Sequence, residues 1–423
     1  MAYVADLHIH SRFANACSGQ LSIPNLALWA GYKGIDLIGT GDCLHPLWQQ
    51  ELERDLQEVG DGAYKLKGTV NSGQGTVRFI FTTEVACIYS ENGKSYRIHT
   101  LIFLPSLDAA KKLSEALKKR GANLSADGRP ILGLSSKQLC ETVFTVEPKA
   151  IIIPAHIWTP WFSLYGSNSG YNSFTDCYGE FSEKIFAVET GLSSEPAMNW
   201  RIPDLDNKSI VSFSDLHSLP RLGREVTLIG GQPTFAGLRD ALRVQDIIGT
   251  IEFFPEEGKY HYSGHRNCNI VYSPKEMKER ENLPAGRQVC PVCNRPLTVG
   301  VLQRVEDLAK RSIEDLRLTI QDGVTRSELF PERAGFRMLV QLEEIIAESV
   351  GATPQSQKVK NEYLKMVTQI DSELKILTKL PIELIAMTAG EKIAEGIQKV
   401  RNGDIYIEPG FDNTYGKVQI WKD

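Results

Sequence analysis

Short apolar segments that end in histidines or carboxylates recur through the first half of this chain. They cover residues 4–9, 35–41, 76–83, 96–104, 150–154, 185–188 and 209–213. Buried strands of a parallel sheet have continuous apolar sequences of this kind. Strands that alternate with helical or looped crossovers are typical of a parallel α/β sheet or barrel. We therefore predict a parallel α/β sheet or barrel for this part of the chain.

Most histidines of the chain follow these predicted strands. The chain has eight histidines, and six of them lie on or directly after the apolar segments: His8, His10, His45, His99, His156 and His217. Barrel enzymes carry their chemistry where the strands end, so these side chains would gather at one mouth of the barrel. Together with Asp42, Glu84 and Asp215 they form a donor set suited to two or three divalent ions, either Zn, Mg or Mn. We therefore predict a multinuclear metal site.

The first segment, V-A-D-L-H-I-H, places three polar groups on one face. Side chains alternate along a strand, so Asp6, His8 and His10 share one side and Leu7 and Ile9 the other. Two imidazoles one residue apart can bind a single metal ion. A chance pair of structural histidines is the alternative interpretation, and the other strand-end histidines argue against it.

Composition limits the class of protein. The chain has 423 residues, of which 42% are hydrophobic and 23% charged, and a net charge of −5. These values fit a globular protein of two or three domains without a globally cationic surface. Because the acidic residue Asp6 lies near the start, we expect no signal peptide. Because no apolar run reaches ~18 residues, we expect no membrane span. Five scattered cysteines predict reduced thiols and a cytoplasmic location.

A second group of metal-binding residues follows the predicted barrel. His265 and Cys268 are separated by two residues, as are Cys290 and Cys293. Two such pairs across a loop of ~20 residues are typical of a closed tetrahedral zinc site, so we predict one structural Zn held by these four residues. His261 is the alternative fourth ligand. The charged segment between the two pairs, residues 279–288, suggests no function.

The remainder of the chain has mainly helical patterns. Residues 301–309 and 333–348 show helical periodicity, and residues 380–401 resemble a helix pair. Residues 351–360 are typical of a linker or exposed loop. Residues 403–421 contain a glycine-bearing turn between two short strand patterns and predict a closing β-hairpin.

These patterns divide the chain into three predicted domains. They are a barrel over residues 1–255, a small zinc-binding domain over 256–300 and a mainly helical domain with a terminal hairpin over 301–423. Within the first domain, residues 158–181 are rich in aromatic and small polar residues. Such residues can stack on unpaired bases and contact phosphates. From this segment alone, a hydrophobic lid over the barrel is the stronger interpretation.

Residues 6–225 resemble the PHP (polymerase and histidinol phosphatase) family. The H-x-H motif of the family matches His8 and His10, and its closing D-x-H matches Asp215 and His217. The remaining matches are Glu84, His99 and His156 and, more loosely, Asp42 and His45 in G-T-G-D-C-L-H-P. Residues 11–18 lack the further acidic or histidine ligand that many trinuclear members carry after H-x-H.

This resemblance implies a distorted seven-stranded β/α barrel around a di- or trinuclear centre that hydrolyses phosphoesters. Divalent ions activate water and stabilise displacement at phosphorus. Glu84 would bridge two ions, with His8, His10 and Asp215 on one and His99 and His156 on the other. His217 would bind a third ion or act near the leaving oxygen. Glu189 would be a general base, a substrate contact or a strand-end cap.

Nearly the whole chain resembles the endonuclease Q family. The resemblance rests on G-T-G-D-x-x-H-P, A-H-x-W-T-P-W-F, E-T-G-L-S-S, F-S-D-L-H-S and C-P-V-C-x-x-P-L. It implies a metal-dependent endonuclease of DNA repair that cuts 5′ of deaminated bases (uracil, hypoxanthine, xanthine) or abasic sites, with the damaged base flipped into a pocket. In archaeal relatives it also implies a sliding-clamp partner, although this sequence has no clamp-binding motif.

Two other functions stay open from the sequence. A PHP-type phosphatase or exonuclease would act on small phosphoesters or strand ends with the same metal site. A DNA-binding accessory module would have a lapsed metal centre, and the near-complete ligand set argues against it.

Overall fold

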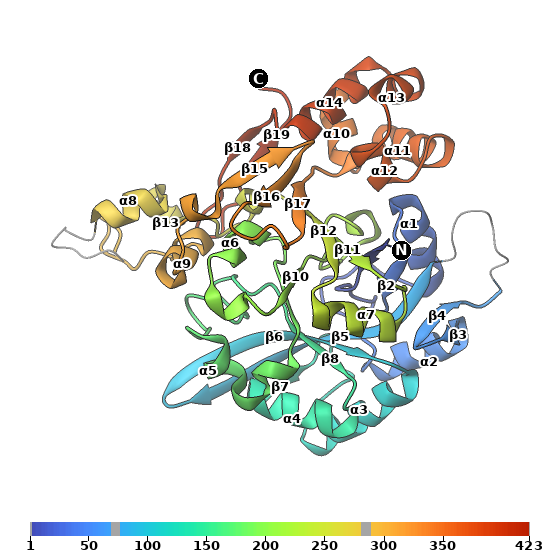
Figure 1. Cartoon of the computed structure of the whole chain (residues 1–423), viewed down its shortest axis with the longest axis vertical. Helices are drawn as coiled ribbons and strands as arrows, with labels where there is room; N and C mark the ends of the chain where they lie inside the picture. Colours follow the sequence, from blue (N-terminus) through green and yellow to red (C-terminus); the bar gives the residue numbers. More distant parts are fainter. Residues whose placement is uncertain (1, 69–76, 281–288, 423) are drawn as a thin grey trace.

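The computed structural model describes residues 2–68, 77–280 and 289–422 (Figure 1). Residue 76 of the predicted strand 76–83 and most of the charged segment 279–288 lie outside the described residues. In the described part of the chain, no helix is long and apolar enough to cross a membrane.

A mixed sheet forms the frame of the first part of the chain. Its strands run in the order β11 (Val226–Gly230), β1 (Ala2–Asp6), β2 (Leu37–Gly39), β5 (Arg78–Glu91), β6 (Lys94–Leu104) and β8 (Ile151–Pro154). The β1–β2 and β2–β5 pairs are parallel. The β1–β11, β5–β6 and β6–β8 pairs are antiparallel. The α/β class is confirmed, but the parallel arrangement is only partial because the long β5–β6 hairpin reverses the chain within the sheet.

A further parallel pair, β9 (Ala187–Glu189) with β10 (Ser209–Val211), lies between β8 and β11. Beyond β8, the Ile157 N–H donates to the Glu189 carbonyl over 3.1 Å. Beyond β10, the Ser212 N–H donates to Thr227 Oγ1 of β11 over 2.9 Å. The strands therefore surround a common interior as a distorted barrel.

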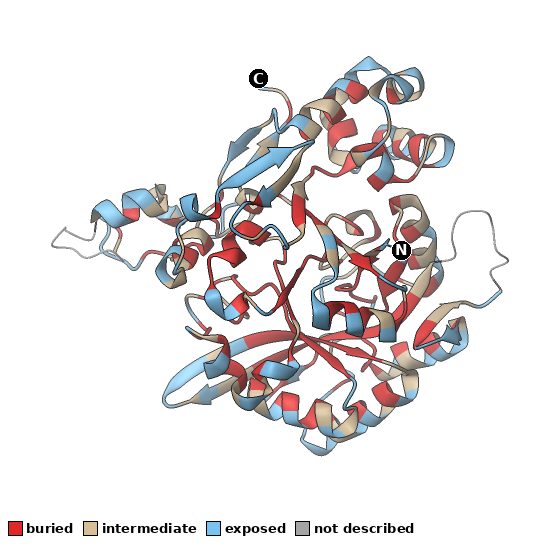
Figure 2. Cartoon of the chain, in the orientation of Figure 1, coloured by how far each residue is buried: buried red, intermediate tan, exposed pale blue. Residues whose placement is uncertain are grey.

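Apolar residues from every strand of this ring meet in that interior. They belong to one buried cluster that includes Ala5, Leu37, Ile80, Leu101, Ile153, Ala187, Val211 and Ile229. Figure 2 shows the buried residues concentrated along these strands. Such a contribution from each strand is what the closed interior of a barrel requires.

Helices and short strands cover the outside of the barrel. The helices are α1 (Ile23–Lys33), α2 (Pro46–Asp55), α3 (Leu107–Lys119), α4 (Ser136–Val146), α5 (Phe174–Tyr178), α6 (Pro196–Trp200) and α7 (Phe235–Val244). The additional strands are β3 (Leu56–Gly60), β4 (Ala63–Leu66) and β7 (Ile131–Leu132). Local sequence sets helix ends: Ser135 and Gln138 form a capping box at α4, and α1 ends where Gly34 adopts a φ of 84°.

The sheet continues from the barrel into the C-terminal part of the chain. Strand β12 (Ile247–Glu252) pairs with β11, and β17 (Gly335–Met338) pairs in parallel with β12. The hairpin of β15 (Leu318–Gln321) and β16 (Val324–Ser327) extends this edge. The helix predicted for residues 333–348 is therefore wrong in its first half, where β17 lies, and only α10 (Leu342–Ser349) is helical.

A packing constraint explains the strand at Gly335. A Cβ atom at this position would lie 2.7 Å from Val324 Cγ1 and 2.9 Å from the Thr325 carbonyl. Glycine thus allows β17 to approach β16 closely, and this tertiary pairing overrides the local helical pattern.

The remaining elements form two groups (Figure 1). The first projects from the side and contains β13 (Ser263–His265), β14 (Ile270–Tyr272), α8 (Pro274–Glu279) and α9 (Val301–Leu308). The second contains α10 with α11 (Gln357–Gln369), α12 (Glu373–Thr378), α13 (Ile382–Ala389) and α14 (Glu391–Asn402). The helix pair and the terminal hairpin are confirmed, the latter as β18 (Tyr406–Glu408) paired with β19 (Lys417–Gln419). The predicted loop 351–360 overlaps the start of α11.

Short 3₁₀ helices connect several of these elements. They are η1 (Gly179–Lys184), η2 (Pro203–Leu205), η3 (Leu219–Arg221), η4 (Pro255–Glu257), η5 (Arg266–Cys268) and η7 (Glu314–Leu316).

A buried ion pair joins the C-terminal helices to the barrel. Lys33 Nζ at the end of α1 lies 2.6 Å from Glu373 Oε2 at the start of α12. Both side chains are almost fully buried, at 1% and 3% exposure. The two charges compensate each other, Lys33 also donates to the Pro220 carbonyl, and Glu373 also accepts the Leu342 N–H.

Candidate metal centre

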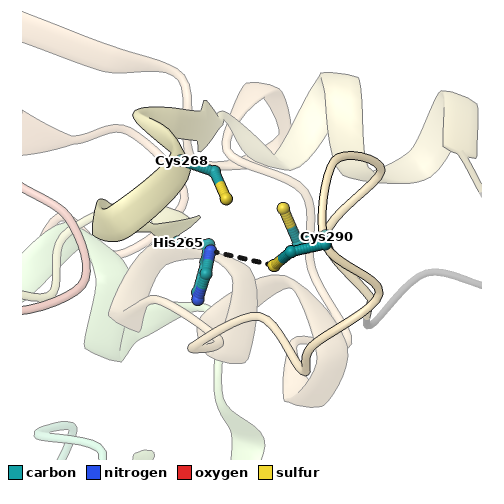
Figure 3. Close-up of side chains that lie close together, drawn as sticks. His265, Cys268 and Cys290 are labelled. Carbon is teal, nitrogen blue, oxygen red and sulfur yellow. Dashed lines mark hydrogen bonds between the residues drawn. The ribbon is translucent and has the colours of Figure 1, made fainter.

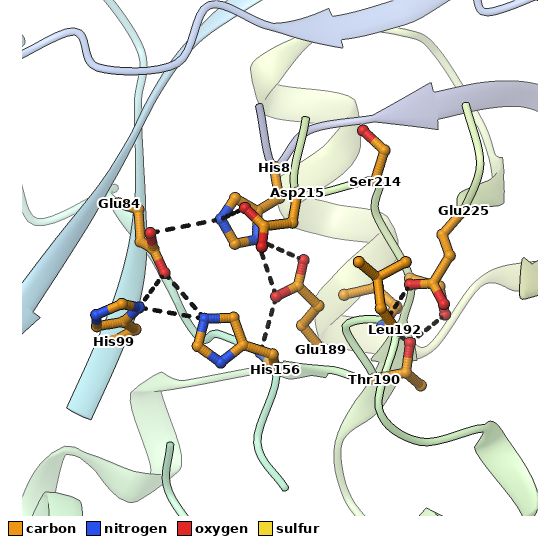
Figure 4. Close-up of polar contacts among 12 residues, drawn as sticks. His8, Glu84, His99, His156, Glu189, Thr190, Leu192, Ser214, Asp215 and Glu225 are labelled. Carbon is orange, nitrogen blue, oxygen red and sulfur yellow. Dashed lines mark hydrogen bonds and ion pairs between the residues drawn. The ribbon is translucent and has the colours of Figure 1, made fainter. Parts of the chain in front are cut away.

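Histidines and carboxylates from distant parts of the sequence meet inside the barrel (Figure 4). The described residues at this site are His8, His10, Asp42, Glu84, His99, His156, Glu189, Asp215 and His217. The strand predicted for residues 4–9 ends at Asp6, so His8 and His10 follow it. Glu84 lies within β5 instead of after it, because β5 continues to pair with β6 beyond this residue.

The first metal-binding group is formed by His8, His10, Glu84 and Asp215. His8 Nε2 lies 3.7 Å from Glu84 Oε2 and 3.5 Å from Asp215 Oδ1. His10 Nε2 lies 3.5 Å and 3.3 Å from the same two oxygens. In the described part of the chain, both Nε2 atoms and Asp215 Oδ1 are buried without a hydrogen-bond partner. Buried polar atoms that converge without partners are costly, and a divalent cation among them would satisfy all of them.

Carboxylates behind the two histidines fix their orientation. His8 Nδ1 lies 2.8 Å and 3.0 Å from the two oxygens of Glu189, and His10 Nδ1 lies 3.1 Å from Asp42 Oδ1. These contacts assign the proton of each ring to Nδ1 and leave the Nε2 lone pair directed at the centre of the site. Metal-binding histidines are commonly oriented in this way.

Glu189 and Asp42, two carboxylates that the sequence predicts at the metal centre, therefore lie behind the histidines that face it. Glu189 also accepts the His156 backbone N–H over 2.8 Å, so both its oxygens orient other residues of the site. Asp42 Oδ2 accepts the Ser11 backbone N–H over 2.6 Å and the Ser11 hydroxyl over 2.7 Å. The geometry thus favours positioning roles for Glu189 and Asp42.

The second group uses the other oxygen of Glu84. Glu84 Oε1 lies 2.7 Å from His99 Nδ1 and 3.1 Å from His156 Nε2, and these two nitrogens are 3.2 Å apart. Because Oε2 faces the first group and Oε1 the second, Glu84 is placed as a bridging carboxylate would be.

A third group consists of His10, Asp215 and His217, whose candidate ligand atoms lie within 4.8 Å of one another. His217 Nδ1 is 2.9 Å from the Asp215 carbonyl, which orients the ring. This group shares His10 and Asp215 with the first, and the first shares Glu84 with the second. This mixture of imidazole and carboxylate donors fits divalent ions.

Burial and ion pairing set the charge of the site. Desolvation opposes ionisation of Glu84, but His99 and His8 hold its pKa well below the usual value. Desolvation likewise opposes ionisation of Asp215, and His8 and His10 outweigh it and lower the pKa. Desolvation lowers the pKa of His99 to about 4, which keeps this imidazole in the neutral form that binds metals.

Three site residues have left-handed backbones. Asp42, His156 and Asp215 have φ values of 47°, 30° and 45°, a conformation that costs free energy in residues other than glycine. Arg224 supports the strained Asp215 segment, since its Nε donates to the Ser214 carbonyl over 2.8 Å. The fold therefore maintains these conformations where they aim side chains into the site.

His45, predicted as a ligand, is not brought into the site. Its ring stacks on Phe13 with centroids 4.5 Å apart, and it precedes the first residue of α2. It belongs to none of the metal-binding groups among the described residues. The chain turns between Asp42 and His45, so that the carboxylate faces His10 and the imidazole enters an aromatic pocket.

Arg129 is a site residue that the sequence patterns did not reveal. Its Nη1 donates to Glu84 Oε2 over 3.2 Å. The residue lies in an irregular loop before β7 and belongs to no spaced motif, so only the folded chain places it at the site.

The aromatic segment 158–181 is mostly buried structure. Trp158, Tyr165, Phe174 and Tyr178 have at most 2% exposure, which supports the lid interpretation for these residues. Phe162, in contrast, is partly exposed, and its ring lies 4.8 Å from the ring of His99.

The four residues of the predicted zinc knuckle lie together, and Figure 3 labels His265, Cys268 and Cys290 among them. His265, Cys268, Cys290 and Cys293 offer ligand atoms within 4.8 Å of one another, and His265 Nδ1 is 3.6 Å from Cys293 Sγ. Burial opposes ionisation of Cys290, but the backbone N–H groups of Cys293 and Val292 lower its pKa to about 7. His261 is buried elsewhere and is not part of this group.

Comparisons with known sequences identify relatives without an assigned function. A family model described as the MJ0043 C-terminal domain matches residues 341–404. The uncharacterised protein MJ0043 of Methanocaldococcus jannaschii is 30% identical over 271 residues, which are 62% of this chain and 31% of that protein. This chain therefore spans about a third of that relative. The uncharacterised protein YqxK of Bacillus subtilis is 28% identical over 438 residues, 98% of each chain.

Comparisons with solved structures are more informative. The lesion-specific endonuclease PfuEndoQ from Pyrococcus furiosus is 30% identical with a TM-score of 0.81, over 99% of this chain and 95% of that chain. Endonuclease Q in complex with a 27-mer duplex that has an abasic lesion at the active site is also 30% identical, with a TM-score of 0.82. That match covers 100% of this chain and 97% of the other.

Proposed function

This chain belongs to the endonuclease Q family, and we propose that it is a metal-dependent DNA repair endonuclease. It hydrolyses the phosphodiester on the 5′ side of a deaminated base or an abasic site. The observation that carries the proposal is the buried, unpartnered set of ligand atoms on His8, His10 and Asp215. Divalent ions, when bound there, supply an activated water and stabilise the charge that develops on the phosphate.

The residues of the site have different roles. His8, His10 and Glu84, together with the neighbouring Asp215, would hold one ion. Glu84 with His99 and His156 would hold a second. His217 completes a third position with His10 and Asp215. Glu189 and Asp42 keep the two histidines of the H-x-H motif in the ligating tautomer. The ions are Zn, Mg or Mn, which suit this mixture of imidazole and carboxylate donors.

The zinc knuckle has a different role. A site with three thiolates and one imidazole is closed, with no open position for substrate. We assign one structural Zn to His265, Cys268, Cys290 and Cys293, where it would join β13 and η5 to the turn at residues 290–293. The domain boundaries after residues 255 and 300 follow from this assignment. The cytoplasm is the compartment that provides both reduced thiols and chromosomal DNA.

DNA with a single lesion provides the test. Duplexes with one uracil, hypoxanthine, xanthine or abasic site, labelled on both strands, are incubated with the protein and Mg, Mn or Zn. We expect a single cut 5′ of the lesion, lost on chelation and in Asp215→Ala. Asp108→Ala, at an exposed carboxylate that pairs with Lys112 on α3, is the matched control and should cut normally.

Other results would contradict the proposal. Degradation from strand ends without lesion preference, or release of phosphate from small phosphoesters alone, would assign the site to a PHP-type exonuclease or phosphatase. Intact strands with every metal would exclude a nuclease.

A further inference from the structure

Arg129 places a guanidinium group directly against the metal-binding carboxylate. Its Nη1 lies 3.2 Å from Glu84 Oε2, and the Arg129 side chain is 28% exposed, whereas Glu84 is fully buried. Asp215 also attracts Arg129 electrostatically. Arg129 therefore stands at the border between the buried ligands and solvent, where a substrate would arrive.

The loop that carries Arg129 is fixed at several points. Asp127 Oδ1 accepts both the Arg129 N–H and the Asn15 N–H over 3.1 Å. The Gly128 N–H donates to the Phe13 carbonyl over 2.9 Å, and the Ala86 N–H donates to the Pro130 carbonyl over 3.0 Å. The loop is thus attached both to the segment after H-x-H and to β5, the strand of Glu84.

Gly128 brings this loop into direct contact with the site. A Cβ atom at residue 128 would overlap the Asp42 carboxylate that orients His10. The sequence therefore uses glycine where the loop packs on this carboxylate. A group positioned so closely on the metal ligands is preorganised for the reaction and is not a chance surface contact.

The contact between Arg129 and Glu84 conflicts with metal binding. Glu84 Oε2 is the same oxygen that faces His8 Nε2 and His10 Nε2. A divalent ion held by these atoms would use that oxygen as a ligand, and its positive charge would repel the guanidinium. Arg129 then needs another anion within reach of its partly exposed position. A phosphodiester offers two anionic oxygens that match the donors of an arginine.

We propose that Arg129 is a catalytic residue that binds a non-bridging oxygen of the scissile phosphate. Its guanidinium holds the phosphodiester in place and stabilises the charge that grows on phosphorus oxygens during cleavage. The assignment rests on the proposed function for the identity of the substrate. The competing explanation is that Arg129 only neutralises Glu84 and has no contact with substrate.

Single-turnover cleavage and metal binding together separate these explanations. Arg129→Met should reduce single-turnover cleavage of the abasic duplex by ~10²-fold or more, the usual effect of losing one charge-stabilising donor. It should bind Mn at least as tightly as the unmodified protein in calorimetric titration, because a competing cation has gone. Arg129→Lys should recover part of the rate, since it keeps the charge without the planar fork.

The matched control is Arg120→Met, which removes an arginine on the barrel surface that lies 3.9 Å from Glu141. It should leave both cleavage and Mn affinity unchanged. Arg129→Met with a normal cleavage rate, or with a loss of Mn affinity as large as its loss of rate, would overturn the proposal.

Inorganic phosphate tests the same contact without DNA. The Mn-loaded protein should bind phosphate at least ~10-fold more tightly than Mn-loaded Arg129→Met, as one charge-assisted contact predicts. Equal affinities would refute the role of Arg129. This result decides the inference even if the protein cuts none of the lesion duplexes, an outcome that would refute only the proposed function.

Discussion

Glu189→Gln tests how far a carboxylate that touches no ion controls the metal centre. Glu189 accepts two buried N–H groups, from His8 Nδ1 and from the His156 backbone, each over 2.8 Å. Glutamine has a single acceptor oxygen, so in either orientation its NH₂ group faces one of these donors. A buried donor left without an acceptor costs ~1–3 kcal/mol. The substitution also removes one negative charge beside the cations.

The expected result is a weaker metal centre in a folded protein. Substituting a carboxylate that orients a metal-binding histidine lowers metal affinity by ~10–100-fold, equivalent to ~1.4–2.8 kcal/mol. Calorimetric titration with Mn measures the affinity, and circular dichroism verifies the fold. Glu180→Gln, at an exposed glutamate of η1, is the matched control. Unchanged Mn affinity in Glu189→Gln would refute the positioning role and leave a direct substrate contact or general base as the alternatives.

Three further predictions concern stability and the zinc knuckle. Lys33→Met leaves the buried Glu373 carboxylate unpaired and should lower the free energy of unfolding by ~3–5 kcal/mol, measured by denaturant titration; a loss below ~1 kcal/mol would match only a surface pair. Cys290→Ser should release the structural zinc, measured by elemental analysis, without changing Mn affinity in the barrel, and retention of zinc would contradict the ligand assignment. Desolvation lowers the pKa of His261 to about 4, so this residue destabilises the fold as pH falls below ~6.5. Between ~pH 7 and ~pH 5, the melting temperature of His261→Gln should therefore fall less than that of the unmodified protein. An equal fall in both proteins would refute this role of His261.

The sequence predicts the centre of the site because its signals are local. The two-residue spacing of His8 and His10 puts both imidazoles on one side of an extended chain, and Asp215 and His217 have the same spacing at the end of another apolar segment. Apolar strands of a barrel bring such pairs to a common interior. The α/β class and the family could therefore be identified before the structure, and both are confirmed.

Residues whose roles depend on the path of a loop could not be assigned in this way. Asp42 and His45 lie in one motif, yet the turn between them sends the first toward His10 and the second into a stack with Phe13. Arg129 reaches Glu84 only because its loop is attached to two other segments. No spacing within the sequence encodes these contacts.

The prediction of a helix over residues 333–348 is wrong in its first half for a related reason. Its periodicity is genuine in α10, where Leu342, Ile345 and Ile346 are buried. The preceding residues could form either structure, and the exposed edge of β12 selects a strand through its backbone hydrogen bonds. Local propensity is a weak guide when tertiary pairing competes with it.

Anomalous diffraction from Mn-soaked crystals tests the central claim most directly. The claim is that imidazoles and carboxylates from one barrel mouth bind the ions that cleave DNA. We expect anomalous peaks between His8, His10, Glu84 and Asp215 and between Glu84, His99 and His156. A protein that cleaves lesion DNA with Mn but shows no Mn peak at these residues would contradict the account.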